Sequence, residues 1–336
     1  MAAKMPDSEE FTRLTDPFRR ELLVHCYRML GSVHDAEDLV QETYLRAWRF
    51  YEGFEGRSSL RIWLYRIATS ACLTALEHHS RRLLPSGLGR PGEDTDRPLR
   101  PLPGVEWVQP LPDALFGAPG DTTTADPAAI VASRDSVRLA LIAVLQHLPA
   151  RQRAVLILRD VLAWRAAEVA ELLGTTTAAV NSALQRARAQ IERVAPKEDE
   201  LDEPAEPSVR ALLRRYTAAF ENADINTLLQ LLRDDVALEM PPDPEWFAGR
   251  AAVGRFLAGN VLFEPGVFRL VATGANGQPA VAAYLRGRDG VHRAHAVQVL
   301  TVTRTGISRI VSFNDPGLFT LFGLDSTLGA ARASVG

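Results

Sequence analysis

Hydrophobic residues recur at helical spacing along two separate stretches of this 336-residue chain, residues 9–82 and about 130–194. Between them, residues 83–128 hold nine of the chain's 21 prolines, a composition that resists helix formation and favours a semi-extended linker. We therefore predict a helical domain at 9–82, a proline-rich linker at 83–128 and a second helical domain at 129–195.

The last third of the chain follows a different pattern. Residues 196–207 contain six acidic residues and one lysine, as expected of a solvated connector. Residues 208–325 begin with two helical stretches and continue as strands separated by turn sequences such as ATGANGQP and GRDG. Two runs of alternating residues suit a curved sheet with one covered face: Val281, Ala283 and Leu285, and Val297, Val299 and Thr301. The predicted fold class is multidomain, with two all-α domains followed by an α+β domain.

Within the first domain, the segment DAEDLVQETYLRAW, residues 35–48, predicts a helix with two unlike faces. The core stripe consists of Val40, Tyr44, Ala47 and Tyr51. The other face presents carboxylates and an amide around one leucine: Asp35, Asp38, Gln41, Glu42 and Leu45. Acids in a first helical turn favour the helix dipole, which accounts for them but not for an exposed leucine. An apolar centre with a charged surround indicates a docking surface for a basic partner.

The next predicted helix begins at Leu60 and combines arginines with aromatic residues. Residues 57–82 hold five arginines against one glutamate, a local net charge of +4. Arginine binds phosphates of any sequence, and aromatic rings such as Trp63 and Tyr65 stack on unpaired bases. The candidates for contact with melted DNA are Arg57, Arg61, Trp63, Arg66 and Ser70. The alternative for Trp63 is a place in the core of an amphipathic helix.

Residues 148–192 have the signature of a helix-turn-helix. A helix at 165–173 is followed by Gly174, which suits a left-handed turn, and a threonine among residues 175–177 caps the next helix. That second helix carries groups that match base edges in the major groove: Thr177, Asn181, Ser182, Gln185, Arg186 and Arg188. Small units of this kind also serve as packing modules, and this alternative stays open.

Composition narrows the classes of function. A net charge of −3 excludes a globally basic nucleic-acid binder, so DNA contact must depend on local patches. Neither a long apolar run nor an apolar signal core is present, so we expect a cytoplasmic protein without membrane contact. Cys26 and Cys72 fall in predicted helices and are expected to be buried free thiols. We predict no cofactor and no metal site.

These motifs resemble those of extracytoplasmic-function (group IV) RNA polymerase sigma factors. DAEDLVQETYLRAW is similar to their region 2.2 helix, which implies binding to the β′ clamp of core RNA polymerase. WLYRIAT is similar to regions 2.3–2.4, which implies contact with the promoter −10 element, although Ser70 and Thr74 stand where asparagine and aspartate are common. Residues 148–192 resemble region 4, which implies recognition of the −35 element and contact with the β flap.

Residues 208–325 resemble the SnoaL-like domain, a cystatin-type cone fold that some long members of this group carry. Its relatives include isomerases and cyclases, and the polar candidates here are His292, His295, Gln298, Asn314 and Asp315. Because no facing acid–base pair can be placed among them, we interpret them as surface or turn residues and predict that the chain is not an enzyme.

The linker contains an apolar patch, GVEWVQPLPD at residues 104–113, which a fully solvated segment would not need. We predict that Trp107 and Val108 dock this patch on the C-terminal domain. The combined prediction is an alternative sigma factor that directs core RNA polymerase to promoter DNA and is regulated by its own C-terminal domain, with a small ligand for that domain left open. The alternatives are a helix-turn-helix regulator acting without polymerase, or a SnoaL-like enzyme fused to DNA-binding helices.

Overall fold

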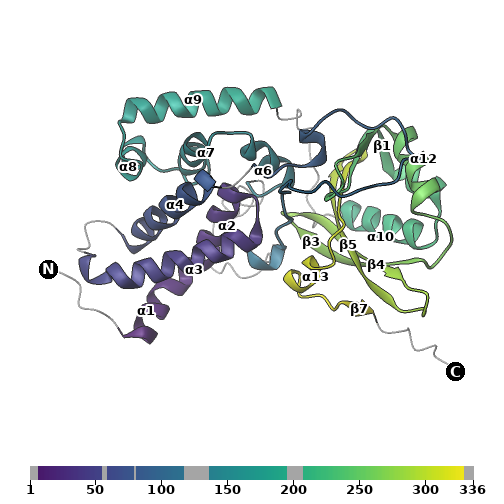
Figure 1. Ribbon diagram of the computed structural model, residues 1–336, viewed down its shortest axis with the longest axis horizontal. Coiled ribbons are helices and arrows are strands. Elements are labelled where there is room, and N and C mark those ends of the chain that lie inside the picture. The colour runs from purple at the N-terminus through teal and green to yellow at the C-terminus, as the bar shows by residue number, and fades with distance from the viewer. Residues whose placement is uncertain (1–6, 55–58, 79–80, 117–135, 195–206, 329–336) are drawn as a thin grey trace. The chain divides into compact units, whose positions relative to one another are not determined.

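A glycine and a serine set the turn between the first two long helices. In the computed structural model, which describes residues 7–54, 59–78, 81–116, 136–194 and 207–328, Gly31 ends α2 (Arg19–Leu30) with a left-handed φ of 72°. Ser32 then caps α3 (Val33–Phe50) by accepting a hydrogen bond from the backbone N–H of Asp35 at 3.2 Å. Around them lie α1 (Ser8–Thr15), η1 (Asp16–Phe18), η2 (Tyr51–Gly53) and α4 (Leu60–His78) (Figure 1).

A second group of helices contains the predicted helix-turn-helix. It consists of α6 (Leu139–Gln146), α7 (Ala150–Leu156), the π-helical turn η5 (Ile157–Val161), α8 (Ala166–Leu172) and α9 (Thr177–Val194). Gly174 adopts a φ of +60° between α8 and α9, as the left-handed turn requires. Among the three threonines that follow, Thr176 is the cap, because its hydroxyl accepts the backbone N–H of Ala179 at 3.2 Å.

The two helical groups form one structural unit, residues 1–82 with 115–196. A buried polar network joins them. Arg28 of α2 donates to the backbone carbonyl and the hydroxyl of Ser136, and Arg153 of α7 donates to the backbone carbonyl of Met29 and to the side-chain oxygen of Gln146. Both arginines are only 3% exposed, and burial lowers the pKa of each guanidinium to about 10. A buried guanidinium is costly unless it is hydrogen-bonded, so Arg28 and Arg153 depend on partners that the other helical group supplies.

The interior of the first group is built largely by α2, which is buried from Leu22 to Leu30. The imidazole of His25 lies 2.9 Å from the hydroxyl of Thr69 on α4. Cys26 and Cys72 are free and buried, as predicted, and the pKa of the Cys72 thiol is raised by its hydrogen bond with Cys26 and by burial. Across the described residues, no helix combines the length and apolar character needed to cross a bilayer.

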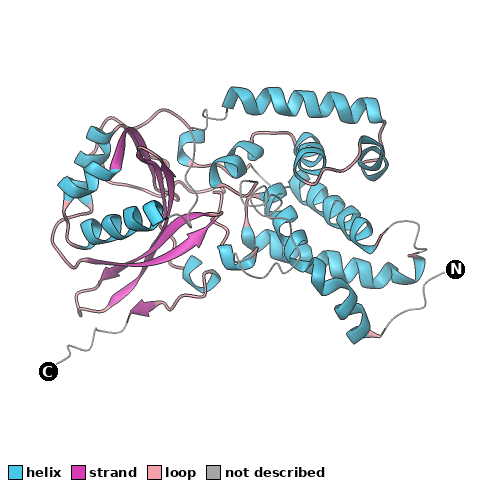
Figure 2. Ribbon diagram, turned by 180° about the vertical axis from the view of Figure 1, so that it is seen from behind, coloured by secondary structure: helices cyan, strands magenta, loops and turns pink. Residues whose placement is uncertain are grey.

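The C-terminal unit, residues 83–114 with 197–336, is a helix-covered sheet. Its strands are β1 (Leu232–Glu239), β2 (Trp246–Ala248), β3 (Phe268–Ala275), β4 (Gln278–Arg286), β5 (His292–Thr303), β6 (Gly306–Phe313) and β7 (Thr327–Leu328). The order is β2-β1-β6-β5-β4-β3, with β7 paired to β5. The strands β3 to β6 form the predicted antiparallel meander, and β1 joins β6 in parallel. The helices are α10 (Pro207–Glu221), α11 (Ile225–Leu231), α12 (Arg250–Asn260) and α13 (Leu318–Leu321) (Figure 2).

The expectation of one covered sheet face is wrong for β4, which is buried on both faces from Gln278 to Tyr284. On one side, the core is formed with α10, α11 and α12. On the other side, the ring of Tyr284 packs edge-on against Phe319 of α13 at 4.9 Å, and its hydroxyl donates to the backbone carbonyl of Asp325. The alternating pattern in sequence did not reveal this second cover, because alanine fits either environment.

The first part of the proline-rich segment, residues 83–114, belongs to the C-terminal unit. It contains η3 (Pro85–Gly87), and η4 (Asp113–Leu115) begins at its end. Val108 is 0% exposed, and its backbone N–H donates to the carbonyl of Leu83 at 3.1 Å, while Trp107 is half-buried in a bridge with Leu83. Farther along, the backbone of Leu111 exchanges hydrogen bonds with Asn276 in the β3–β4 turn. Trp107 and Val108 thus contact another part of the same segment, whereas Leu111 bonds the segment to the C-terminal domain.

Candidate functional site

The outward face of α3 presents a leucine among polar side chains. Leu45 is 54% exposed, and Asp38 and Gln41 are exposed beside it. Neither of these two polar side chains has a partner among the described residues. Behind them, Val40 and Ala47 are fully buried, so the helix has the two faces that its sequence predicts. An exposed apolar side chain surrounded by unpaired polar groups is suited to docking a partner.

Two acids of the same helix are already paired. The carboxylate of Asp35 forms an ion pair with Arg82, and Glu42 pairs with Arg46 one turn later at 2.7 Å. The i,i+4 pair is half-exposed and worth about 0.3–0.5 kcal/mol, so it can open for a partner at little cost. Asp35 is more firmly engaged because Arg82 is largely covered, which leaves Asp38, Gln41 and Leu45 as the accessible centre of the face.

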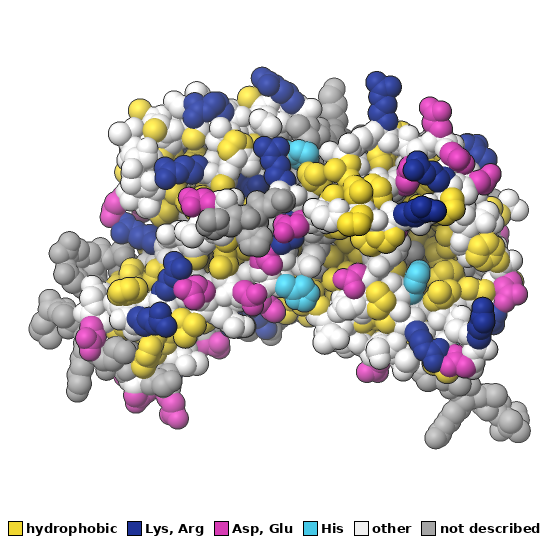
Figure 3. Space-filling view, in the orientation of Figure 1, with side chains coloured by type: hydrophobic (Ala, Val, Ile, Leu, Met, Phe, Trp, Pro, Cys, Tyr) yellow, Lys and Arg dark blue, Asp and Glu magenta, His cyan; other side chains and the backbone are white. Residues whose placement is uncertain are grey.

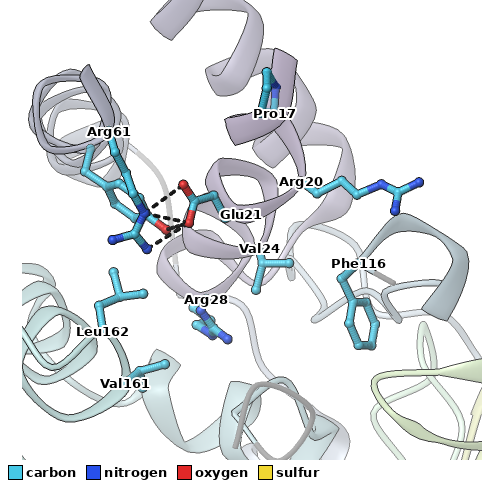
Figure 4. Close-up of a pocket in the computed structure, with 10 residues that line it drawn as sticks. Pro17, Arg20, Glu21, Val24, Arg28, Arg61, Phe116, Val161 and Leu162 are labelled. Carbon is cyan, nitrogen blue, oxygen red and sulfur yellow. Dashed lines mark hydrogen bonds and ion pairs between the residues drawn. The ribbon is translucent and has the colours of Figure 1, made fainter. Parts of the chain in front are cut away.

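Arg61 on α4 forms a bidentate ion pair with Glu21 of α2. Three nitrogen–oxygen distances join them, two of 2.9 Å and one of 2.8 Å, and the hydroxyl of Tyr65 donates to the same carboxylate at 3.3 Å (Figure 4). The hydrogen bond with Glu21 raises the pKa of Arg61. The pair lies on one wall of a pocket of about 630 Å³ that Arg20 and Arg28 also line. A phosphate would have to compete with Glu21 for Arg61.

The aromatic residues of α4 are less available for stacking than their sequence spacing indicates. Tyr65 is 1% exposed, so its predicted role as a stacking surface is wrong. Trp63 is half-buried, with its ring centroid 4.9 Å from that of Phe54 and 6.2 Å from that of Tyr51. The alternative prediction for Trp63, a place in the helix core, therefore accounts for these ring contacts, although part of the ring stays accessible. Ser70 is exposed on the same helix, whereas Arg57 lies outside the described residues.

Arg66 connects α4 to the helix-turn-helix. Its guanidinium lies 2.5 Å from the carboxylate of Glu171 on α8. Close by, Tyr65 packs edge-on against Trp164, which precedes α8, with ring centroids 5.7 Å apart. In this packed arrangement, a candidate DNA-binding arginine of the first helical group is neutralised by an acid of the second.

The outer face of α9 carries most of the predicted base-reading groups in accessible positions. The exposed residues are Thr177, Asn181, Ser182, Gln185, Arg186 and Arg188, while Val180, Leu184 and Ala187 are buried beneath them. Arg188 is exposed but already occupied, because its guanidinium forms a bidentate ion pair with Asp160 of η5 at 2.9 Å and 2.7 Å. Arg186 has no such partner within the described residues, so it is the guanidinium best placed for a base edge.

Three of the five polar candidates in the C-terminal domain line a cavity of about 400 Å³: His295, Gln298 and Asn314. Their interpretation as surface or turn residues is therefore wrong. The other two fit it: His292 lies 3.1 Å from the backbone carbonyl of Gly266, and Asp315 accepts the backbone N–H of Gly317 in a turn. No group of three or more metal-ligating side chains occurs in the part of the chain that the structure describes.

Sequence reasoning missed the buried arginines Arg28 and Arg153 and the contribution of Leu99 to the cavity wall. The arginines occur in ordinary amphipathic helices, and their partners lie more than 100 residues away in sequence. Leu99 is a single apolar residue among prolines and charges, a weak signal that becomes informative only when the domain beneath it is known.

Three family models match successive parts of the chain: Sigma-70 region 2 over residues 14–82, Sigma-70 region 4 over 138–191 and a SnoaL-like domain over 213–313. The chain is 51% identical over 321 residues to the ECF RNA polymerase sigma factor SigG of Mycobacterium tuberculosis, covering 95% of this chain and 85% of that protein. This chain belongs to the ECF RNA polymerase sigma factors. It is also 30% identical to SigJ of the same organism, over 86% of either protein.

The crystal structure of SigJ supports the same architecture for the sigma factor described here. It superimposes with a TM-score of 0.60 at 26% identity, covering 95% of this chain and 100% of that one. The region 2 match contains α2, α3 and α4, the region 4 match contains α6 to α8 and most of α9, and the SnoaL-like match contains β1 to β6. These findings do not favour either alternative, the regulator acting without polymerase or the enzyme fused to DNA-binding helices.

Proposed function

We propose that this sigma factor docks on the β′ clamp of core RNA polymerase through α3, contacts the −10 element through α4 and the −35 element through α9, and touches the β flap with region 4. We further propose that the C-terminal domain regulates these contacts by holding the segment that connects region 2 to region 4. The observation that carries the polymerase assignment is the exposed Leu45 beside Asp38 and Gln41.

The chemistry of this face fits a basic rod. Carboxylates steer a cationic partner toward the face, and a central apolar side chain supplies the desolvated contact that holds it. Because Asp35 and Glu42 are paired within the chain, Asp38 provides the accessible negative charge. This arrangement has no evident use for a protein that binds only DNA.

The test is a pull-down with core RNA polymerase, followed by promoter-specific transcription in vitro. We expect Leu45→Glu and Asp38→Lys each to weaken polymerase binding by at least tenfold while leaving the thermal unfolding midpoint unchanged, since both side chains face solvent. Leu14→Glu, which places the same charge on an exposed leucine of α1, is the matched control and should bind normally. Unchanged polymerase binding by both α3 variants would overturn the docking assignment.

Regulation through the linker is supported by its attachment to the C-terminal domain. The carboxylate of the fully buried Glu239 on β1 pairs with Arg309 on β6 and accepts the backbone N–H of Ser86 at 2.8 Å. At the far end, Asp113 accepts the backbone N–H of Gly277 at 2.9 Å. A segment anchored at both ends limits the separation that region 2 and region 4 can reach, which is how the C-terminal domain would control promoter engagement.

A further inference from the structure

The cavity in the C-terminal domain lies between α10, α12 and the sheet. Its volume is about 400 Å³, within the range of small-molecule sites, and its walls are mostly aromatic and aliphatic. Phe220, Phe256 and Phe268 contribute rings from two helices and a strand, and Phe263, which is 68% exposed, lies at its edge. Figure 3 shows hydrophobic side chains gathered in a hollow on this unit. Such walls suit a flat, largely apolar molecule.

A bulge in β5 places polar groups in this apolar wall. His295 and Gln298 are three residues apart, so regular alternation would send them to opposite faces of the sheet. The register of β4 against β5 shifts by one residue, with Ala283 opposite Ala296 and Tyr284 opposite Ala294, which leaves His295 as the extra residue. The bulge therefore turns His295 toward the same cavity as Gln298.

These polar groups have hydrogen-bonding capacity left over. The side-chain oxygen of Gln298 accepts the hydroxyl of Tyr216 at 2.9 Å, and that of Asn314 accepts the hydroxyl of Ser312 at 3.0 Å. Neither side-chain NH₂ group has a partner among the described residues, and the same holds for the ring nitrogens of His295. Buried or half-buried N–H donors without partners are the groups that a ligand oxygen would satisfy.

The charge state of the wall limits the class of ligand. None of the described residues that line the cavity is an acid, an arginine or a lysine. Burial lowers the pKa of His295, so its ring is neutral at neutral pH. A charged ligand would lose its hydration without gaining an ion pair, whereas a carbonyl or hydroxyl oxygen would find N–H donors.

The proline-rich linker covers part of this cavity. Leu99 is half-buried between exposed neighbours and forms part of the cavity wall, and the backbone carbonyl of Thr95 accepts a hydrogen bond from the side chain of Asn260 at 2.9 Å. The covering segment, residues 93–100, lies between two backbone anchors, Gly92 to Trp246 at 2.7 Å and Leu102 to Pro242 at 3.2 Å. Between these two anchors, Arg97 of the covering segment forms an ion pair with Glu245, which is exposed on the Arg97 side and therefore weak.

We propose that the cavity binds a neutral, largely apolar molecule carrying a carbonyl or hydroxyl group, and that residues 93–100 of the linker close over it through Leu99. A role for this ligand site in transcription rests on the proposed function, in which the C-terminal domain regulates the sigma regions through the linker. Ligand atoms would fill the space beneath Leu99 and add contacts to a lightly held segment, so binding orders the linker that joins region 2 to region 4.

The ligand class is tested on the full-length chain with three probes that share one ring system: 2-acetonaphthone, 2-naphthoate and 2-naphthylmethylammonium. We expect saturable binding of the ketone and binding of both charged probes weaker by at least ~tenfold. His295→Phe keeps a ring at the bulge and should weaken ketone binding roughly fivefold, the effect of one lost hydrogen bond. Equal binding of all three probes, or no saturable binding of the ketone, overturns the proposal.

Closure of residues 93–100 over the cavity, which we call the lid, is tested by hydrogen–deuterium exchange over residues 92–102. The ketone should slow exchange in this segment of the native chain. Leu99→Ala should bind it roughly tenfold more weakly and lose the protection, through lost apolar contact. Leu102→Ala is the matched control, since Leu102 is 41% exposed and does not line the cavity. Absence of protection in the native chain, or the same loss in both variants, overturns the lid.

Transcription with core polymerase separates the two levels of inference. A chain that initiates at promoters but does not bind the ketone refutes the ligand site and leaves the proposed function standing. A chain that binds the ketone but does not associate with polymerase refutes the proposed function and leaves the site standing.

Discussion

Arg66 on α4 and Glu171 on α8 form an ion pair at 2.5 Å, so a candidate −10 contact of region 2 is occupied by an acid of region 4. Promoter DNA can engage Arg66 only if this pair opens. Both side chains are partly solvent-exposed, and exposed ion pairs are worth about 0–1 kcal/mol, so the pair acts as a weak competitor for phosphate rather than as a lock. The buried network around Arg28 and Arg153 holds the two regions together more firmly.

Glu171→Gln should therefore increase affinity for single-stranded −10 DNA, by up to about fivefold, because it removes the competing carboxylate and keeps the side-chain shape. The gain should shrink as salt is raised, since the pair is screened. Fluorescence anisotropy with a labelled oligonucleotide at two salt concentrations measures both effects. Glu9→Gln, an exposed acid on α1, is the control, and an equal gain there would point to net charge instead of this pair.

On the recognition helix, Gln185→Ala and Arg186→Ala should each reduce −35-dependent transcription roughly tenfold or more, as expected for lost base-edge contacts of about 1–3 kcal/mol. Both should also reduce discrimination between the correct −35 sequence and single-base variants. Arg193→Ala, at the exposed end of α9, should instead weaken binding equally for all sequences and lower its salt dependence. A sequence-independent loss in all three variants would contradict base reading by Gln185 and Arg186.

The buried imidazole of His25 should make the stability of the folded chain sensitive to acid. Burial, and secondly the charge of Arg28, lowers the pKa of its imidazole to about 3 in the folded chain. The unfolded chain, with a pKa near 6.5, binds the proton more readily, so this contribution to stability is complete above pH 6.5 and decreases as pH falls toward 3. Between pH 7.5 and 5.5, the free energy of unfolding should drop by about 1.4 kcal/mol from this residue.

Urea unfolding of the native chain and of His25→Gln at both pH values measures this drop. The glutamine amide can keep the hydrogen bond to Thr69 without titrating, so the difference between the two proteins isolates the imidazole. The variant should lose the pH-dependent component whatever its absolute stability. An identical pH slope in both proteins would show that other groups, such as His147, govern the acid response.

The elements of this sigma factor follow closely from sequence periodicity. The cap at Thr176, the left-handed turn at Gly174 and the meander of the last domain all depend on local residue chemistry, which a sequence states directly. The two faces of α3 follow in the same way from helical spacing.

Pairing across the chain could not be predicted. The type and helical position of Arg61, Arg66 and Arg188 predict contact with DNA, yet each has an acid partner on another element. Similarly, the sequence gives no sign of the one-residue bulge that turns His295 into the cavity, because the residues on either side of His295 are alanines. What the sequence lacks in each case is the identity of the opposing surface.

Val108 offers a direct test of linker attachment. The side chain is fully buried and the segment that carries it belongs to the C-terminal unit, so Val108→Ala should lower that unit's free energy of unfolding by about 1–3 kcal/mol, from lost apolar burial and the small cavity left behind. Leu88→Ala, in the same linker but at a side chain that is 41% exposed, should change it by less than about 0.5 kcal/mol.

If linker docking controls the separation of region 2 and region 4, Val108→Ala and Trp107→Ala should also alter promoter-specific transcription with core polymerase, and Leu88→Ala should not. Altered stability with unchanged transcription would show that the patch holds the linker in place without regulating the sigma regions.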